Sequence, residues 1–146
     1  MPTARFIETL RARVTKSPPT LEWIHDAVAN PRSGACANIG WYTLDNATDT
    51  YTRRGGHWMT VTGATATDEE PTIDLHDPAS RSGKGNVTHH ARLKCLTSGT
   101  LTGNRTDLPA SAAGLFVIRD GIMPKEVAKG EKTFPIIDGI VVFVLE

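Results

Sequence analysis

A histidine and an aspartate stand at the two ends of one stretch of the sequence and could act together as a general base. The stretch GGHWMTVTGATATDEEPTIDLHDP places His57 after two glycines and Asp77 before a proline. A carboxylate that accepts the N–H of an imidazole fixes the tautomer of the ring and stabilises the imidazolium. The other ring nitrogen is then able to take a proton from a nucleophile. The two residues would form the base half of a catalytic triad if the fold brings them together.

The residues between them predict a β-hairpin that would do so. HWMTVTG and PTIDLHD alternate apolar and polar residues as strands do, and ATATDEE between them is polar enough for a turn region. Facing residues of an antiparallel pair have a constant sum of positions and point to the same side of the sheet. Setting His57 opposite Asp77 also produces two apolar pairs on one face, Met59 with Leu75 and Val61 with Ile73. From these residues alone a structural reading stays open, in which His57 is a partly buried strand residue and Asp77 serves a turn before Pro78.

The chain before this hairpin predicts two helices. Between Thr3 and Lys16 the apolar residues recur at helical spacing, at Phe6, Ile7, Leu10 and Val14. Pro18 and Pro19 would end that helix. Thr20 is suited to cap a second helix, and NPRSG, with its proline and glycine, is suited to end it. The apolar face of this second helix would consist of Leu21, Ile24 and Val28.

Strands are expected for most of the remaining chain. GACANIGWYTL precedes the hairpin, while VTHHARLKCL, LFVIRDG and the terminal IIDGIVVFVLE follow it. Helices followed by a run of strands favour an α+β fold with a mainly antiparallel sheet. We therefore expect residues 1–146 to form a single domain, with a helical lead over residues 1–31 and an antiparallel sheet with long loops over residues 32–146.

Composition excludes several classes of function. Lysine and arginine together number 16, as do aspartate and glutamate, so the formal charge is zero and nucleic acid is not expected as a partner. The longest apolar run is far shorter than the roughly 20 residues of a membrane span, and no targeting segment indicates a compartment. The sequence contains no GxGxxG, GxxxxGKS or GxSxG motif, so no cofactor is predicted.

A family resemblance supports the chemistry of the His57–Asp77 pair. A strand, then GGHW opening an apolar-alternating strand, then a further strand ending in DP, resembles the carboxy-terminal half of papain-like cysteine peptidases. The likeness is greatest to the bacterial branch related to double-glycine leader peptidases, and it runs from Leu21 to Pro78. It implies that His57 is the general base and that Asp77 orients it. Gly56 and Trp58 match neighbouring, substrate-binding positions of the motif, which implies a peptide or protein substrate.

The nucleophile that this family requires is missing from its expected place. A catalytic thiolate is favoured at the amino terminus of a helix, and there is no cysteine before Thr20. Cys36 lies in a predicted strand among small residues, which is typical of a buried hydrophobe, and Cys95 follows the histidine in the chain. Three explanations remain: the chain is part of a larger peptidase, it is an inactive relative that binds peptides, or a partner chain supplies the thiol. Sheet surface left uncovered by a missing helical half would favour a homodimer or another partner.

Two alternatives come from other classes of function. A metal-dependent hydrolase would draw on nitrogen and oxygen donors, but no HExxH spacing occurs and neighbours along a strand point to opposite faces, so no metal is predicted. The donors considered are His57, Asp74, His76, Asp77, His89 and His90. The second alternative is a non-catalytic binding or structural module. In it RRGGHW is a loop that holds a peptide, with apolar contacts from Trp41, Tyr42 and Trp58.

Overall fold

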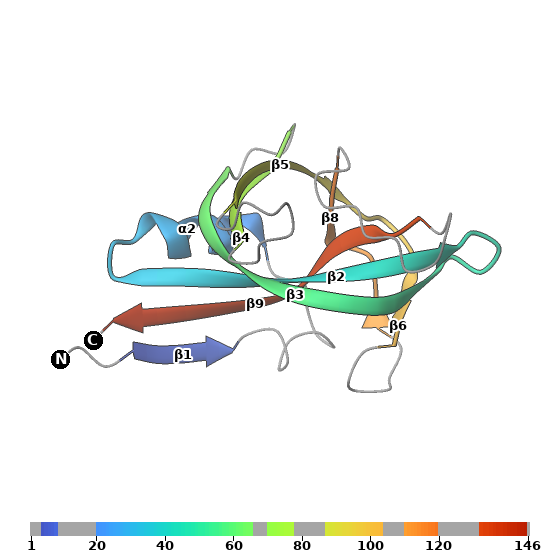
Figure 1. Ribbon diagram of the computed structural model, residues 1–146, viewed down its shortest axis with the longest axis horizontal. Coiled ribbons are helices and arrows are strands. Elements are labelled where there is room, and N and C mark those ends of the chain that lie inside the picture. The colour runs from blue at the N-terminus through green and yellow to red at the C-terminus, as the bar shows by residue number, and fades with distance from the viewer. Residues whose placement is uncertain are drawn as a thin grey trace.

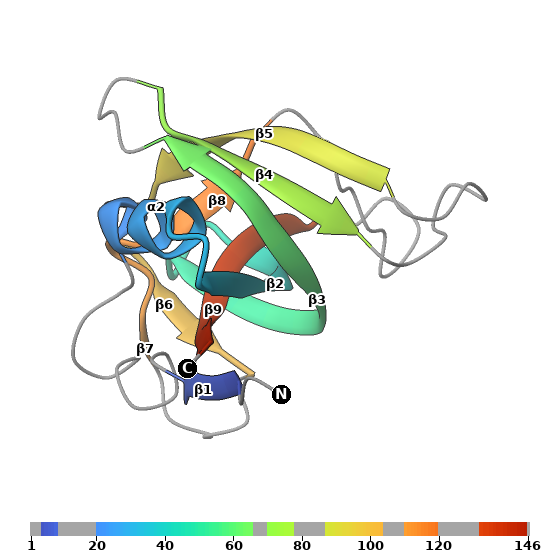
Figure 2. The ribbon, with the colours of Figure 1, turned by 90° about the vertical axis from the view of Figure 1, so that its left-hand side faces the viewer.

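The protein is mainly β-structure, and six of its strands close into an antiparallel barrel (Figures 1 and 2). The computed structural model describes residues 4–8, 20–65, 70–77, 87–103, 110–119 and 132–145. Around the barrel, each strand pairs with the next and the last pairs with the first. In this order they are β2 (Ser33–Asp45), β3 (Thr50–Thr65), β4 (Thr72–Asp77), β5 (Val87–Cys95), β8 (Phe116–Ile118) and β9 (Phe134–Leu145). Three short strands extend the sheet: β1 (Ala4–Glu8) beside β9, β6 (Thr100–Thr102) parallel to β3, and β7 (Ala110–Ser111) beside β6.

The barrel corrects the predicted fold class, and the prediction of an α+β fold with two leading helices is wrong. Ala4–Glu8, which lies inside the first predicted helix, is a strand that pairs antiparallel with β9, from Ala4 opposite Leu145 to Glu8 opposite Val141. Pairing with an available sheet edge outweighs a modest helical periodicity, since tertiary context overrides local propensity. The remainder of that predicted helix lies outside the described residues.

The second predicted helix is confirmed as α2 (Leu21–Ala29). Thr20 caps it, because the Thr20 Oγ1 accepts a hydrogen bond of 3.2 Å from the Trp23 backbone N–H. The helix packs on β2 and β3, and its buried residues join the core inside the barrel. The buried face consists of Leu21, Ile24 and Ala27, with Val28 packed against it. The helix therefore covers one part of the barrel with apolar side chains.

The apolar residues form two clusters. The first fills the barrel beneath α2 and includes small residues of β2 and β5 that leave room for larger ones. The second lies where the β2–β3 hairpin meets β6 and the residues before β8. Its buried members are Tyr42, Tyr51, Leu101, Ala112, Leu115 and Ile136. Strands β2 and β3 contribute side chains to both clusters.

The β3–β4 hairpin forms with a register that differs from the predicted one. Val61 lies opposite Leu75 instead of Ile73, which is a shift of two residues, and an irregularity after Val61 shifts the following pairs by one more. Strand β3 also begins at Thr50, so RRGGHW is part of a long strand and not a loop. A shift of two residues keeps every side chain on its predicted face, since the side-chain period of a strand is two. His57 and Asp77 consequently still point to the same side of the sheet.

Candidate functional site

The predicted contact between His57 and Asp77 is confirmed. Nε2 of His57 lies 2.8 Å from Oδ1 of Asp77. In the observed register the two residues are diagonal neighbours on one face, a separation that a histidine side chain can span. The side chain of Asp77 is 2% exposed, whereas that of His57 is 22% exposed. A buried carboxylate thus holds an imidazole that solvent still reaches, and the catalytic role of the pair stays a prediction.

The surroundings of the His57 ring leave one nitrogen available. Trp41, which is fully buried on β2, lies beside the imidazole with ring centroids 6.5 Å apart. The Nδ1 atom of His57 has no hydrogen-bond partner among the residues that the structure describes. If Nε2 carries the proton that Asp77 accepts, Nδ1 presents a lone pair. The geometry therefore suits a base whose orientation is fixed from one side by a carboxylate.

Burial distinguishes this pair from two other histidine–aspartate contacts. The contacts join His25 with Asp26 and His90 with Asp74. In the His90 pair the side chains are 69% and 38% exposed, and in the His25 pair they are 46% and 81% exposed. Solvent screens an exposed pair, so its contribution to orientation or charge stabilisation is small. The exposed pairs consequently serve as matched controls for His57.

Neither described thiol is placed to react through His57. Cys36 lies opposite Thr60, on the face of the sheet opposite to that of His57. Burial is the main reason that the pKa of the Cys36 thiol is raised, which disfavours the thiolate. Cys95 is exposed at the end of β5, whereas the residue opposite Asp77 is Val87 at its start, roughly 25 Å away along the strand. The described residues therefore place no thiol beside this base.

The two predicted substrate-binding residues, Gly56 and Trp58, lie on the outer face of β3. Gly56 is paired with Gly40, and the guanidinium of Arg53 occupies the space where a Cβ at Gly56 would be. Trp58 is 44% exposed and points to the side of the sheet opposite to His57. The role of both residues in binding a substrate of His57 stays a prediction.

A polar network on this outer face was not predicted from the sequence. Oδ2 of Asp138 accepts hydrogen bonds from the Tyr42 hydroxyl at 2.6 Å and from Nε of Arg53 at 2.8 Å. Nη2 of Arg53 also donates to Oδ1 of Asn38 at 3.0 Å. Asp138 lies at a β-bulge, because Asn38 pairs with Gly139 and Ile39 pairs with Ile137. A bulge re-aims a side chain out of the regular alternation.

The electrostatics of the network keep Tyr42 and Arg53 protonated. Burial and the charge of Asp138 raise the pKa of Tyr42 well above its usual range, so its hydroxyl remains a donor. Burial alone would lower the pKa of Arg53, but the hydrogen bond and charge of Asp138 outweigh burial and the pKa is raised. The one signal in the sequence was Asp138 itself, a carboxylate inside an otherwise apolar strand, which requires a partner when it is buried.

The donors considered for a metal site are dispersed. His90 Nδ1 is bonded to Asp74, and His57 is bonded to Asp77. His89, opposite Leu75 on β5, lies on the other face from His90, while His76 lies on the other face from Asp77. Across the described ranges, no group of three or more histidine, cysteine, aspartate or glutamate side chains is arranged to hold a metal ion.

Comparisons with known proteins find no protein-family model, no curated protein and no solved structure that matches this chain. Among the residues that the structure describes, no helix has the length and apolar character needed to cross a membrane.

Proposed function

We propose that this chain is a cysteine-peptidase-like domain that supplies the base half of the active site. The observation that supports it is the 2.8 Å contact between Nε2 of His57 and the buried carboxylate of Asp77. The resemblance of residues 21–78 to papain-like peptidases is the reason for choosing a thiol as the nucleophile. That thiol comes from outside the described residues, either from another part of the same polypeptide or from a partner chain.

The residues of this chain would act through proton transfer. Nδ1 of His57 takes the proton of the thiol as the sulfur attacks a peptide carbonyl, and the carboxylate of Asp77 stabilises the imidazolium that results. Collapse of the tetrahedral intermediate then expels the amine, which receives the same proton from Nδ1. Because Asp77 is withdrawn from solvent, its charge acts on the ring with little screening.

The base half can be tested with a thiol supplied in solution. The protein is mixed with N-acetylcysteine methyl ester and a peptide activated ester, and the rate of acyl transfer to the thiol is measured. We expect an acceleration that is smaller than the roughly 10²–10⁴-fold contribution of a base in a complete active site. It should disappear in His57→Gln and be reduced in Asp77→Asn, which retains the ring but removes the charge.

The exposed pair on β4 and β5 provides the control. His90→Gln removes a histidine that also contacts an aspartate, but whose side chain is 69% exposed. We expect this variant to retain the acceleration of the wild type. Equal losses in His57→Gln and His90→Gln would reveal non-specific imidazole catalysis and contradict the proposal. An absence of any acceleration by the wild-type protein would leave His57 and Asp77 with a structural role.

A further inference from the structure

Trp58 lies exposed on the outer face of the barrel, over three neighbouring strands. It is the one large apolar side chain of the described residues that is classed as exposed, at 44%. Trp58 pairs with Asn38 across β3 and β2, and Asn38 pairs in turn with Gly139 on β9. The outermost carbon of the indole lies 3.6 Å from the position that a Cβ on Gly139 would take. The ring therefore extends along the sheet surface from β3 towards β9 (strands labelled in Figure 1).

The polar network adjoins this ring. Asn38, the cross-strand neighbour of Trp58, accepts a hydrogen bond from Arg53, and Arg53 is bonded to Asp138. We call these four residues the Trp58 face. Cross-strand neighbours have Cβ atoms about 4.5–5.5 Å apart. A ligand the size of a single six-membered ring could therefore contact the Trp58 indole and the Asn38 side chain together.

The polar residues of the Trp58 face use only some of their side-chain atoms in hydrogen bonds with one another. The hydrogen bonds of Asp138 involve Oδ2 and that of Asn38 involves Oδ1, whereas Arg53 uses Nε and Nη2 and is also bonded to Tyr42. Within the described ranges, Oδ1 of Asp138 and Nδ2 of Asn38 take no part in these bonds. The side chains of Arg53 and Asp138 are 23% and 10% exposed and Asn38 is half-buried, so solvent reaches part of each. The face thus combines an acceptor and a donor beside a guanidinium, all held in place by their mutual bonds.

We propose that the Trp58 face is a binding site for a neutral carbohydrate. A sugar ring presents a flat face of C–H groups that packs on an indole, as apolar groups pack on aromatic rings generally. The hydroxyl groups of a sugar both donate and accept hydrogen bonds. They can therefore donate to a carboxylate oxygen and accept from nearby guanidinium and amide N–H groups. The single positive charge of Arg53 is balanced by Asp138, which favours a ligand without net charge.

Two other classes of ligand fit the same surface less well. A peptide that adds to a sheet needs an unpaired strand edge, but at Asn38 strand β2 is already paired with both β3 and β9. A nucleic acid would require cations in excess of anions, and here Arg53 is matched by Asp138. The site is distinct from the His57–Asp77 pair, which lies on the opposite face of β3, and the inference does not depend on the proposed function.

Binding can be tested on the full chain with an array of immobilised oligosaccharides of glucose, galactose, mannose and N-acetylglucosamine, together with acidic glycans. Hits are followed by titration of the soluble sugar, monitored by NMR of the ¹⁵N-labelled indole groups. We expect at least one neutral sugar to bind saturably and to shift the Trp58 indole signal. Trp58→Ala should weaken that binding by about tenfold or more, since it removes the aromatic contact. Trp58→Tyr should retain most of the affinity, and the control variant His90→Gln should retain all of it.

Several results would overturn the inference. One is that no neutral sugar in the panel binds at millimolar concentration, and another is that a sugar binds equally well to Trp58→Ala and to the wild type. Binding confined to acidic glycans would show that charge, and not the neutral face, is responsible. A wild-type dimer in light scattering that becomes a monomer in Trp58→Ala would show that the exposed indole contacts a second copy of the chain.

Discussion

Replacing Gly40 by alanine should disrupt the outer polar network of the barrel. A Cβ added at Gly40 would overlap the carboxylate of Asp138, lie 2.5 Å from the Tyr42 ring and lie 3.0 Å from Nε of Arg53. All three groups belong to one hydrogen-bonded unit, and Tyr42 is fully buried. The new methyl group therefore cannot be accommodated by rotating a single flexible side chain into solvent.

The expected cost follows from two contributions. Forcing a methyl group into a packed site typically costs about 1–3 kcal/mol. Displacing the Asp138 carboxylate also weakens its hydrogen bonds with Tyr42 and Arg53, and bonds to a charged group each contribute about 1.5–3 kcal/mol when fully lost. Alanine recovers about 0.5–1 kcal/mol relative to glycine in a strand. We expect Gly40→Ala to lower the free energy of unfolding by about 2–5 kcal/mol, with partial loss of the two bonds.

Urea denaturation followed by circular dichroism measures this change, and Gly63→Ala is the matched control. A Cβ at Gly63 would approach Oδ2 of Asp74 at 2.7 Å, but that side chain is 38% exposed and can rotate away. Gly63→Ala should therefore change the free energy of unfolding by less than about 1 kcal/mol. An equally small change in the free energy of unfolding for Gly40→Ala would refute the prediction. It would show that Asp138, Tyr42 and Arg53 can move apart at little cost.

Three further predictions concern the core, alkaline pH and the thiols. Ile24→Ala should lower the free energy of unfolding by about 2–5 kcal/mol in the same urea assay, because Ile24 is 1% exposed within the barrel core. A loss below about 1 kcal/mol would contradict the burial of Ile24 in that core. The pKa of Tyr42 is raised by burial and by Asp138, so the folded state holds the phenol proton more tightly than the unfolded state does. The free energy of unfolding should therefore fall as the pH rises above about 10. In a pH series of urea unfolding Tyr42→Phe should flatten that decline, and an unchanged slope would contradict the prediction. Iodoacetamide should label the exposed Cys95 before Cys36, whose pKa is raised mainly by burial, as followed by mass spectrometry of the intact protein; the reverse order would show that Cys36 is accessible.

The contact between His57 and Asp77 was predictable from sequence even though the register was not. Alternation along a strand determines which face a side chain occupies, and this survives a shift of two residues. The pairing itself depends on the turn and on the irregularity after Val61, neither of which changes the alternation of residues before it. The faces could therefore be read from the sequence, whereas the partners of Val61 and Leu75 could not.

The fold class and the polar network needed information that the sequence does not carry locally. The strand at Ala4–Glu8 exists because β9 offers an edge at the other end of the chain, and a local helical pattern gives no hint of that edge. Asp138 meets Arg53 and Tyr42 across a separation of many residues and at a bulge. Closure of a barrel is likewise a long-range property, since β2 pairs with β9 near the end of the chain. The short helix at Leu21–Ala29 was predicted correctly because its cap and apolar face are local.

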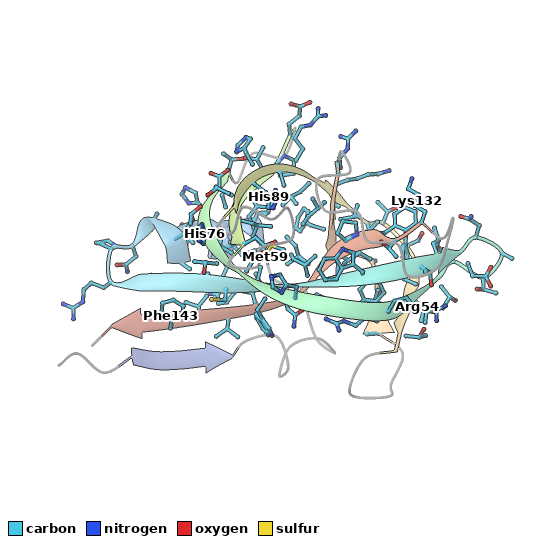
Figure 3. All side chains as sticks on the ribbon, in the orientation of Figure 1. Arg54, Met59, His76, His89, Lys132 and Phe143 are labelled. Carbon is cyan, nitrogen blue, oxygen red and sulfur yellow. The ribbon has the colours of Figure 1, made fainter. Side chains whose placement is uncertain are left out.

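The passage of β2 and β3 through both apolar clusters has a consequence for how the protein loses its structure. Ala37 and Met59 lie opposite each other in the barrel core, and Tyr51 of the second cluster lies opposite Leu44, which packs against that cluster. Both clusters thus depend on the same pair of strands, although the register of that pair shifts between Trp41 and Tyr42 (Figure 3 draws the side chains on the ribbon). Because each of the two strands runs through both clusters, we expect that loosening one cluster weakens the other. Amide protons of β2 at both ends should then exchange with solvent at the same free energy of opening, that of global unfolding.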